Sequence, residues 1–371
     1  MGRKEVKVNF KTITPLWTGD AWQESKEIRP SSDEAGDALR EREKIRPSSL
    51  IGSLRFWFET LMYFAGVLEK EEYNKELGRF EKEVDRKKLR NCLKNKGNDF
   101  DSIIECLKEQ NIPISSVVFG TTNWKGLIGI KEIGKISSSK DYLYPLGKVE
   151  FPEFRHNKEI PTWYFRRGFY GSFEVVFSVE EEILEPIFYP LLNFMDNYGF
   201  WGGKWNIGYG RLKVEGIIVE ENSINLNEKN IFNLTAMYYD RKIEFSPLAQ
   251  NIQNEIVEKV NNFEDLYNSN LANQDKKVKV YFYKGRNTNN TKNSQFKSIN
   301  IIRELLKVKI NKRRDIQDAG LRHKIFGKTG RLDYTPQGSK ILPFIWEENG
   351  QLKGGFLSIA GLLTLEGGQN G

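Results

Sequence analysis

The sequence predicts an α+β protein whose first 221 residues form a ferredoxin-like (RRM-like) domain with the order β-α-β-β-α-β. Three observations predict this fold. Residues that alternate between apolar and polar mark strands, apolar residues at helical spacing mark two helices between them, and the length of 371 residues suits two domains. We therefore expect one domain over residues 1–221 and a second over residues 222–371.

The first strand and the first helix have the clearest patterns. Val6–Thr14 alternates strictly, which is typical of a strand with one buried face. After a polar stretch at 19–47, a helix is expected to begin near Ser48 or Ser49, whose hydroxyls can cap its free amides. The apolar stripe of this helix consists of Leu50, Leu54, Trp57, Phe58, Leu61 and Ala65.

The rest of the first domain follows from the same patterns. An insertion is expected over about 69–110, because this stretch is highly charged and helical in character, with a break at Gly97. The remaining elements expected, in order, are strand and turn at Val117–Ile133, one long strand at Trp163–Val179, a helix from Leu184 to Met195 that ends near Gly199, and a strand at Leu212–Val219.

The second domain is less sharply patterned. We expect strands at Phe232–Tyr239, Lys277–Tyr283 and Lys340–Trp346, and a helix at Ser298–Lys309. Lys284–Lys297 contains almost nothing apolar and is expected to be a mobile loop.

The composition limits the classes of function that the protein could have. Lys and Arg outnumber Asp and Glu by 57 to 50, for a net charge of +7, which makes a polyanionic partner reasonable. Cys92 and Cys106 are too few for a disulfide framework, so we expect free thiols in a reducing cytoplasm. With only two histidines, we expect no catalytic residue, no metal site and no small-molecule cofactor. No apolar stretch is long enough to span a membrane.

Two phosphate-binding patterns are incomplete. The segment FGKT at Phe326–Thr329 resembles the end of a P-loop, but Arg322 stands where that loop needs its first glycine. The segment GYG at Gly208–Gly210 lacks the third glycine of a dinucleotide-binding loop, since Lys213 stands there. Neither supports a nucleotide-binding enzyme.

The start of the first helix is the first candidate anion site. KIRPSSLIGSLRFW places cations and hydroxyls where the free amides and the helix dipole favour a phosphate. The alternative is an ordinary capped helix in which Arg55 pairs with Glu59 four residues on. The candidate residues are Lys44, Arg46, Ser48, Ser49, Gly52 and Arg55.

Two further segments combine cations with features that suit nucleic acid. The glycine-rich loop GGKWNIGYGR offers glycines for close approach, aromatic rings for stacking and cations for charge; the alternative is a plain turn with surface aromatics. The run Lys307–Arg331 is basic, although such a run is often only a solvated face. The candidates are Lys204, Trp205, Gly208, Tyr209, Gly210 and Arg211 in the loop and Arg313 and Arg314 in the run.

These segments together resemble a known family. TPLWTG (Thr14–Gly19), IRPSSLIGSLRFWFE at the first helix and GGKWNIGYGR after the second, within this frame, resemble the RAMP superfamily of CRISPR effector proteins. More narrowly they resemble subunit one of the type III-B Cmr complex. The likeness covers residues 5–215 with specific motifs and is loose beyond.

The resemblance implies tandem ferredoxin-like domains and a non-catalytic, RNA-binding structural subunit of a cytoplasmic ribonucleoprotein in antiviral defence. Its partners would be guide RNA and target RNA, near the 3′ end of the guide, and the other Cmr subunits. The family's RNA contacts map onto Arg46, Ser48, Ser49, Arg55, Lys204, Gly208, Gly210 and Arg211. Two alternatives remain: a metal-independent RAMP-type RNA endonuclease with His156 as general base, and a protein scaffold whose basic surfaces are incidental.

Overall fold

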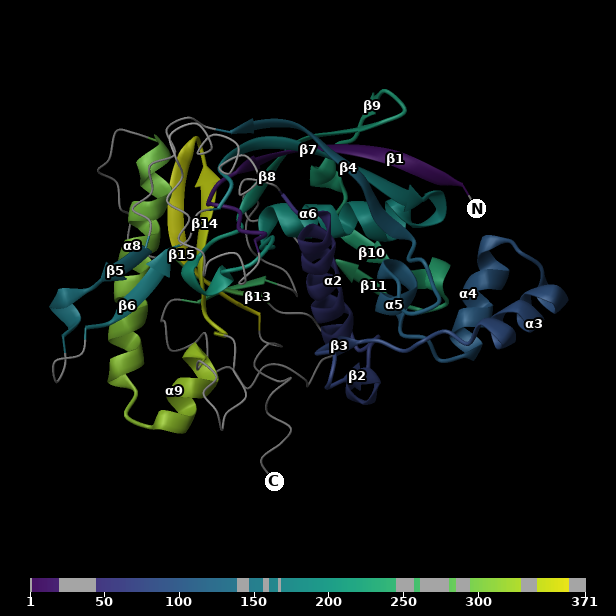
Figure 1. Cartoon of the computed structure of the whole chain (residues 1–371), viewed down its shortest axis with the longest axis horizontal. Coiled ribbons are helices and arrows are strands. Elements are labelled where there is room, and N and C mark those ends of the chain that lie inside the picture. The colour runs from purple at the N-terminus through teal and green to yellow at the C-terminus, as the bar shows by residue number, and fades with distance from the viewer. Residues whose placement is uncertain are drawn as a thin grey trace, which may run out of the picture.

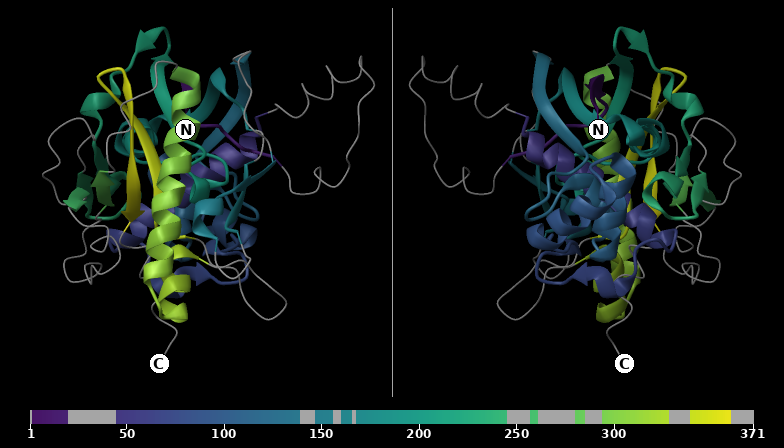
Figure 2. Two further views of the ribbon diagram at one scale, coloured as in Figure 1. Left: turned by 90° about the vertical axis from the view of Figure 1, so that its left-hand side faces the viewer. Right: turned by 90° about the vertical axis from the view of Figure 1, so that its right-hand side faces the viewer.

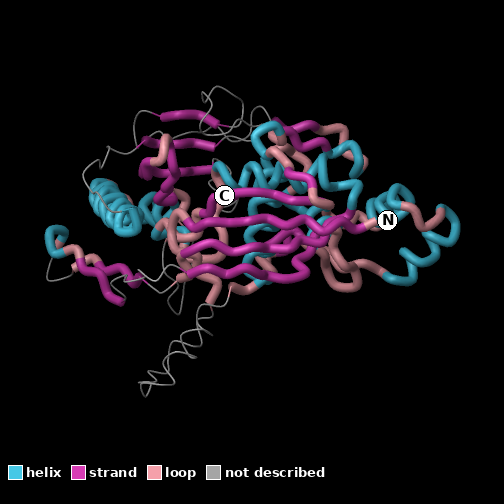
Figure 3. Tube along the Cα trace, turned by 90° about the horizontal axis from the view of Figure 1, so that it is seen from above, coloured by secondary structure: helices cyan, strands magenta, loops and turns pink. Residues whose placement is uncertain are grey.

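The computed structural model describes residues 2–19, 45–138, 147–155, 160–165, 168–244, 257–260, 280–284, 294–327 and 339–359. Its first sheet has the strand order β4-β7-β1-β8-β9, and every neighbouring pair is antiparallel. A central pair, β7 and β1, with β4 and β8 outside it, is the ferredoxin-like arrangement (Figures 1 and 3). The strands are β1 (Arg3–Thr12), β4 (Ile128–Ser138), β7 (Gly171–Glu180), β8 (Leu212–Val219) and β9 (Asn222–Ser223).

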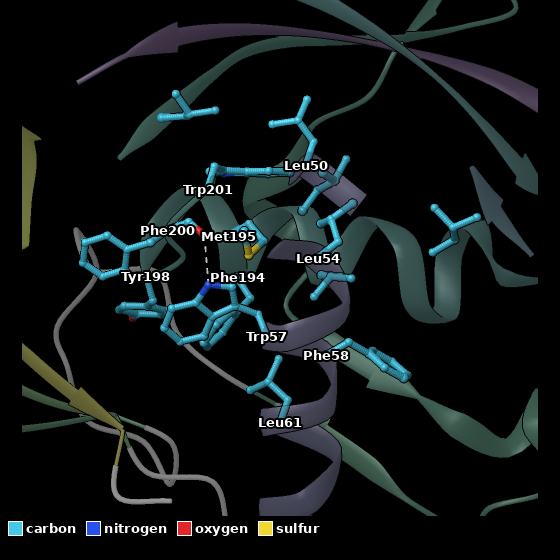
Figure 4. Close-up of a cluster of buried hydrophobic side chains, with 14 of the residues drawn as sticks. Leu50, Leu54, Trp57, Phe58, Leu61, Phe194, Met195, Tyr198, Phe200 and Trp201 are labelled. Carbon is cyan, nitrogen blue, oxygen red and sulfur yellow. Dashed lines mark hydrogen bonds between the residues drawn. The ribbon is translucent and has the colours of Figure 1, made fainter. Parts of the chain in front are cut away.

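Helices α2 (Pro47–Phe64) and α6 (Tyr189–Asn197) lie together on one face of this sheet (Figure 1). The predicted stripe of α2 is confirmed, since each of its six apolar residues is buried. In the core between the helices, Trp57 packs against Phe194 and Phe200, and its Nε1 donates a hydrogen bond of 3.0 Å to the carbonyl oxygen of Phe200 (Figure 4). One short stretch of chain beyond α6 is thereby held against α2.

The start of α2 differs from the prediction. Arg46 is the N-cap, Pro47 is the first helical residue, and no side chain caps the helix. The fixed φ of proline and its missing N–H suit the first helical position, so Ser48 and Ser49 move into the first turn. The Ser49 hydroxyl instead donates to the carbonyl oxygen of Thr18, 3.4 Å away.

The insertion forms a small helical unit at one end of the molecule (Figure 1). Gly97 ends α3 with a φ of +112°, which confirms the predicted break. A further helix, α5, occupies part of the stretch predicted as strand and turn: Pro113 starts it and Gly120 ends it. The elements are a 3-10 turn at Lys70–Glu72, β2 (Tyr73–Asn74), β3 (Arg79–Phe80), α3 (Arg86–Lys96), α4 (Phe100–Glu109) and α5 (Ile114–Phe119).

The two cysteines are bonded, so the prediction of free thiols is wrong. Antiparallel packing of α3 and α4 brings Cys92 and Cys106 to a Cα–Cα distance of 5.8 Å, with a sequence separation of 14 residues. The sequence prediction weighed the number of cysteines and not their register on two neighbouring helices.

The long strand predicted at 163–179 is two strands. β6 (Thr162–Phe165) pairs with β5 (Gly147–Glu150) in a separate hairpin, and only β7 joins the main sheet. Between them the backbone at Gly168 lies so close to Leu16 that a Cβ would stand 2.7 Å from the Leu16 carbonyl oxygen. The alternating aromatic residues continue across this break, which is why the pattern suggested one strand.

Residues 222–244 pack against the first sheet and α6. β9 extends the sheet beside β8, and the Asn193 side chain on α6 donates hydrogen bonds to the carbonyl oxygens of Leu226 and Lys229. Only the start of the strand expected at 232–239 is extended. β10 (Ile231–Asn233) pairs with β11 (Lys242–Glu244), and 3-10 turns occupy Leu226–Glu228 and Leu234–Met237. The domain division at residue 221 stays a prediction.

A second sheet has the order β12-β13-β15-β14, and α8 packs against its strands β14 and β15 (Figure 2). Within it β13, α8, β14 and β15 follow the ferredoxin-like connection, and β12 runs parallel to β13 at the edge. The predicted helix and last strand are confirmed, and β12 and β15 were not predicted. The elements are β12 (Val257–Val260), β13 (Val280–Lys284), α8 (Ser294–Asp315), α9 (Ala319–Phe326), β14 (Leu342–Glu348) and β15 (Gln351–Ile359). At the ends of the predicted mobile loop the prediction is wrong, since Lys284 belongs to β13 and Ser294–Lys297 to α8; residues 285–293 lie outside the described residues.

Candidate nucleic-acid interface

Three segments far apart in the sequence meet beside the start of α2. The segment Thr14–Gly19 lies between the helix and the glycine-rich loop. Its Thr18 hydroxyl accepts from the amide of Arg46, and its Trp17 carbonyl oxygen accepts from the amide of Gly203, at 3.2 and 2.8 Å. The loop is also tied to the helix, because the Gly202 amide donates to the Ser53 hydroxyl, 2.8 Å away. We call this surface, made of Trp17–Thr18, Arg46–Gly52 and Gly202–Asn206, the loop edge.

At the helix start the predicted residues reach the surface. Ser48 and Gly52 are exposed, Arg46 and Ser49 are half-buried, and Lys44 lies outside the described residues. A Cβ built on Gly52 would meet no atom within 4 Å, so a ligand can approach the helix backbone there.

The outer half of the glycine-rich loop carries a cation that lies over a tryptophan ring. Lys204 adopts a left-handed conformation with a φ of +65°, and its ammonium lies 5.2 Å from the centroid of the Trp17 ring. Trp205 is half-buried and packs edge-on against Phe56 with a centroid distance of 5.0 Å. Trp17 was not among the predicted site residues, although it stands in the TPLWTG segment.

The glycines of this loop serve the fold. The amides of Gly208 and Gly210 donate to the carbonyl oxygens of Trp205 and Pro15, each at 2.8 Å, and those of Gly202 and Gly203 are occupied as described above. A Cβ on Gly203 would lie 2.7 Å from the Trp17 ring, and one on Gly210 would lie 2.1 Å from the Trp201 carbonyl oxygen. The four glycine amides are therefore not available as the expected cradle for phosphate.

The inner half of the loop is a joint between the two sheets. Gly208, Tyr209, Gly210 and Arg211 are all buried. A Cβ on Gly208 would come within 3.2 to 3.3 Å of Pro343 and Ile302, which belong to β14 and α8. The Tyr209 ring faces Phe165 inside the protein and offers no stacking surface.

Arg211 closes the end of α6. Its guanidinium donates to the carbonyl oxygens of Asp196 and Asn197 in the last turn of the helix, where acceptors lack an intrahelical donor, and to those of Met195 and Gly199. It also donates to the Ile345 carbonyl oxygen at 3.2 Å and lies 4.3 Å from the Phe344 ring centroid. Burial lowers the pKa of Arg211 to about 10, so it remains charged at neutral pH. The structure thus places this predicted RNA contact in the interior.

Arg55, another predicted RNA contact, is also buried. It is 8% exposed, pairs with Glu59 at 2.8 Å, and donates to the carbonyl oxygens of Phe80 and Gly120, each at 2.9 Å. The alternative reading of Arg55 as the partner of Glu59 four residues on is thus the one that the structure contains. Burial raises the pKa of Glu59, and Arg55 opposes that shift. Arg55 ties α2 to the insertion.

Helix α8 adjoins the loop edge. The buried ammonium of Lys309 donates to the carbonyl oxygens of Asn206 and Ile341, at 3.1 and 2.9 Å. Arg313, one turn further, is half-buried, and burial together with nearby Arg322 lowers its pKa. Arg314 is exposed and lies 5.5 Å from the Phe154 ring centroid. Lys309 was not predicted as a site residue, and only its place within the basic run pointed to it.

The open face of the first sheet lacks a stacking surface. The aromatic residues of β1, β4, β7 and β8 are Phe10, Phe173 and Phe177, and all three are buried on the helix side. Three lysines on this face, Lys11, Lys131 and Lys135, pair with glutamates, as Lys135 does with Glu174 at 2.9 Å. RNA-recognition modules of this topology stack bases on sheet aromatics, and that mode has no platform on these strands.

Groups for metal or acid–base chemistry are few. Among the described residues, no cluster of His, Cys, Asp and Glu could hold a metal ion. His156 lies outside the described residues, and His323 is half-buried in α9. In the same part of the chain, no helix is both long and apolar enough to cross a membrane.

Comparisons with known proteins identify the family. The model of the RAMP superfamily matches residues 9–213, more than half of the 371 residues. Among solved structures, the crystal structure of Cmr1 from Pyrococcus furiosus in the apo form is 15% identical, with a TM-score of 0.37 over 96% of this chain and 87% of that chain. No curated protein matches. By the family model, this chain is a member of the RAMP superfamily.

Proposed function

We propose that this protein is a non-catalytic RNA-binding subunit of a type III-B CRISPR (Cmr) ribonucleoprotein. It would contact guide RNA and target RNA near the 3′ end of the guide, alongside other Cmr subunits, in cytoplasmic antiviral defence. Membership of the RAMP superfamily supports the RNA partner. The pair of segments TPLWTG and IRPSSLIGSLRFW supports the narrower assignment.

The observation that carries the proposal is the meeting of three segments in the loop edge. Arg46 and Lys204, separated by more than 150 residues in sequence, both flank Trp17–Thr18. Exposed Ser48 and Gly52 leave room beside them, and Trp205, next to Lys204 in the loop, is half-buried. Cations beside aromatic rings and accessible backbone suit a single strand, whose phosphates bind charge and whose bases stack.

The contact from Lys309 to Asn206 extends this surface toward Arg313 and Arg314 on α8. We therefore propose that RNA runs from the start of α2 across the outer half of the glycine-rich loop to the basic end of α8. Arg55, Tyr209 and Arg211 hold this surface in shape from inside and do not touch the RNA.

The test is the double variant Arg46→Ala, Lys204→Ala, measured by fluorescence anisotropy with labelled single-stranded RNA over a range of salt concentrations. Two lost phosphate contacts should reduce the slope of log K against log salt by about 1.4. The control variant Lys7→Ala, Lys11→Ala removes the same charge from the exposed sheet face. Unchanged affinity and slope in a folded loop-edge variant would contradict the proposal.

The absence of catalysis has its own test. Purified protein incubated with labelled RNA and a chelator should leave the RNA intact. Site-specific cleavage that disappears in His156→Ala would instead favour the RAMP-type endonuclease.

A further inference from the structure

Helix α3, in the insertion, is built unlike every helix that packs in the core. Six of its eleven residues, RKKLRNCLKNK, are Lys or Arg, none is acidic, and none is buried. It lies at the outer end of the molecule (Figure 1). Neither the candidate site nor the proposed function uses it.

Helices α3 and α4 form a helical hairpin, and most of the positive charges of α3 take no part in holding the two helices together. Its partner α4 buries Phe100, Ile103, Ile104, Cys106 and Leu107, and Lys108 of α4 donates to the carbonyl oxygen of Tyr238 at 2.9 Å. Helix α3 is attached to α4 by the Cys92–Cys106 disulfide and by Lys96, which pairs with Glu105 and Glu109 at 2.8 and 2.6 Å. These attachments lie on the inner side of α3.

The outer side of α3 carries Arg86, Arg90 and Lys94, which follow one another at intervals of four residues and therefore share a face. All three are exposed, and none has an ion pair with any residue that the structure describes. Four of the five acids of the hairpin are occupied elsewhere: Asp85 and Asp99 cap the two helices, and Glu105 and Glu109 bind Lys96. The stripe is thus left uncompensated by its own unit.

This stripe opposes the stability of the helix. Like charges four residues apart destabilise a helix by about 0.2–0.5 kcal/mol for each pair. No residue of α3 is fully buried, and only Leu89 and Leu93 pack against the core, so little packing compensates for that repulsion.

The composition of the face identifies the partner's chemistry. Protein interfaces bury aromatic or aliphatic anchors and are poor in lysine, and membrane-surface helices need an apolar face opposite the basic one. The two leucines of α3, Leu89 and Leu93, are partly buried against the core and do not form an apolar outer face. A row of flexible cations without apolar anchors fits a chain of phosphates.

We propose that the outer face of α3, made of Arg86, Arg90 and Lys94, is a second contact for the RNA phosphate backbone, independent of base sequence. The proposal rests on the proposed function in taking RNA as the polyanion. The disulfide fixes the stripe to α4 and hence to the body of the protein, so that binding does not first have to order the helix.

The test uses the full chain and a fluorescein-labelled oligouridine, which has no base pairing of its own. The variant Arg86→Gln, Arg90→Gln, Lys94→Gln removes the stripe and should fold at least as well as the parent, since it relieves repulsion and glutamine favours helix. Its affinity should fall at least about tenfold at ~50 mM salt, and the salt slope should fall by about 2.

The matched control is Lys7→Gln, Lys11→Gln, Lys131→Gln, which removes the same charge from the exposed sheet face. Equal losses in both triple variants would mean a general charge effect and would overturn the inference. The inference would also be overturned if the α3 variant kept the RNA affinity and salt slope of the parent. In that case the partner of this face would be an acidic protein. If the α3 variant weakens binding while Arg46→Ala, Lys204→Ala does not, the loop-edge proposal fails and this one stands.

Discussion

The two halves of the glycine-rich loop have the same kinds of residue and opposite environments. Gly202–Trp205 reaches the surface, with Lys204 over the Trp17 ring, whereas Gly208–Arg211 is buried between two sheets. Lys204 and Arg211 are seven residues apart, and both were predicted to bind RNA. A cation in a glycine-rich loop can bind a ligand or close a helix, and what surrounds it decides which.

Replacing Arg211 should produce the largest effect and the clearest contrast between the halves. Arg211→Met removes the guanidinium donor from the carbonyl oxygens of Asp196, Asn197, Gly199 and Ile345. Because each buried unpaired acceptor costs about 1–3 kcal/mol, we expect the free energy of unfolding to fall by about 4 kcal/mol or more. Urea denaturation measures it.

Lys204→Met is the matched control, since the same change in the outer half should cost less than about 1 kcal/mol. Equal losses of unfolding free energy in Arg211→Met and Lys204→Met would show that the two halves of the glycine-rich loop do not differ.

The glycines provide a second contrast. Gly210→Ala puts a Cβ 2.1 Å from the Trp201 carbonyl oxygen at a φ of +89°, and should destabilise the protein by about 2–4 kcal/mol. Thermal unfolding would detect the change as a lower Tm.

Gly52→Ala should act in the opposite direction. A Cβ at this exposed helical position meets nothing, so the protein should gain about 0.5–1 kcal/mol while its affinity for RNA falls. A stabilised variant with unchanged RNA affinity would remove Gly52 from the loop edge.

A smaller effect should depend on pH. Burial, and then the charge of Arg313, lowers the pKa of Lys309 from 10.5 to about 7. Between about pH 7 and 10.5 the unfolded chain binds the extra proton, so this residue makes stability rise with pH by at most about 1.4 kcal/mol per unit.

Comparing urea denaturation of the parent with that of Lys309→Met isolates this residue from the others that titrate. The difference in unfolding free energy between the two proteins should change with pH across that window. A constant difference would place the Lys309 ammonium in contact with water.

The elements that sequence predicted best are those whose pattern is local. The alternation in β1, the stripe of α2 and the bounds of β8 depend on periodicity within a few residues, and Gly97 ends a helix by its own conformational freedom. The sequence prediction failed where a distant contact intervened. Gly168 lies against Leu16 and ends one strand before the next, and the register of two helices joins Cys92 to Cys106.

The candidate site divides in the same way. Sequence by itself determined which segments carry the family's motifs, because cations, glycines and aromatic residues can be read directly from the chain. Only the tertiary structure decided which of those cations reach water, since exposure depends on what packs around each side chain. Arg46 and Lys204 come together at the surface through Trp17 and Thr18, whereas Arg55 and Arg211 find their acceptors inside, where a buried guanidinium is stable only if carbonyl or carboxylate oxygens surround it.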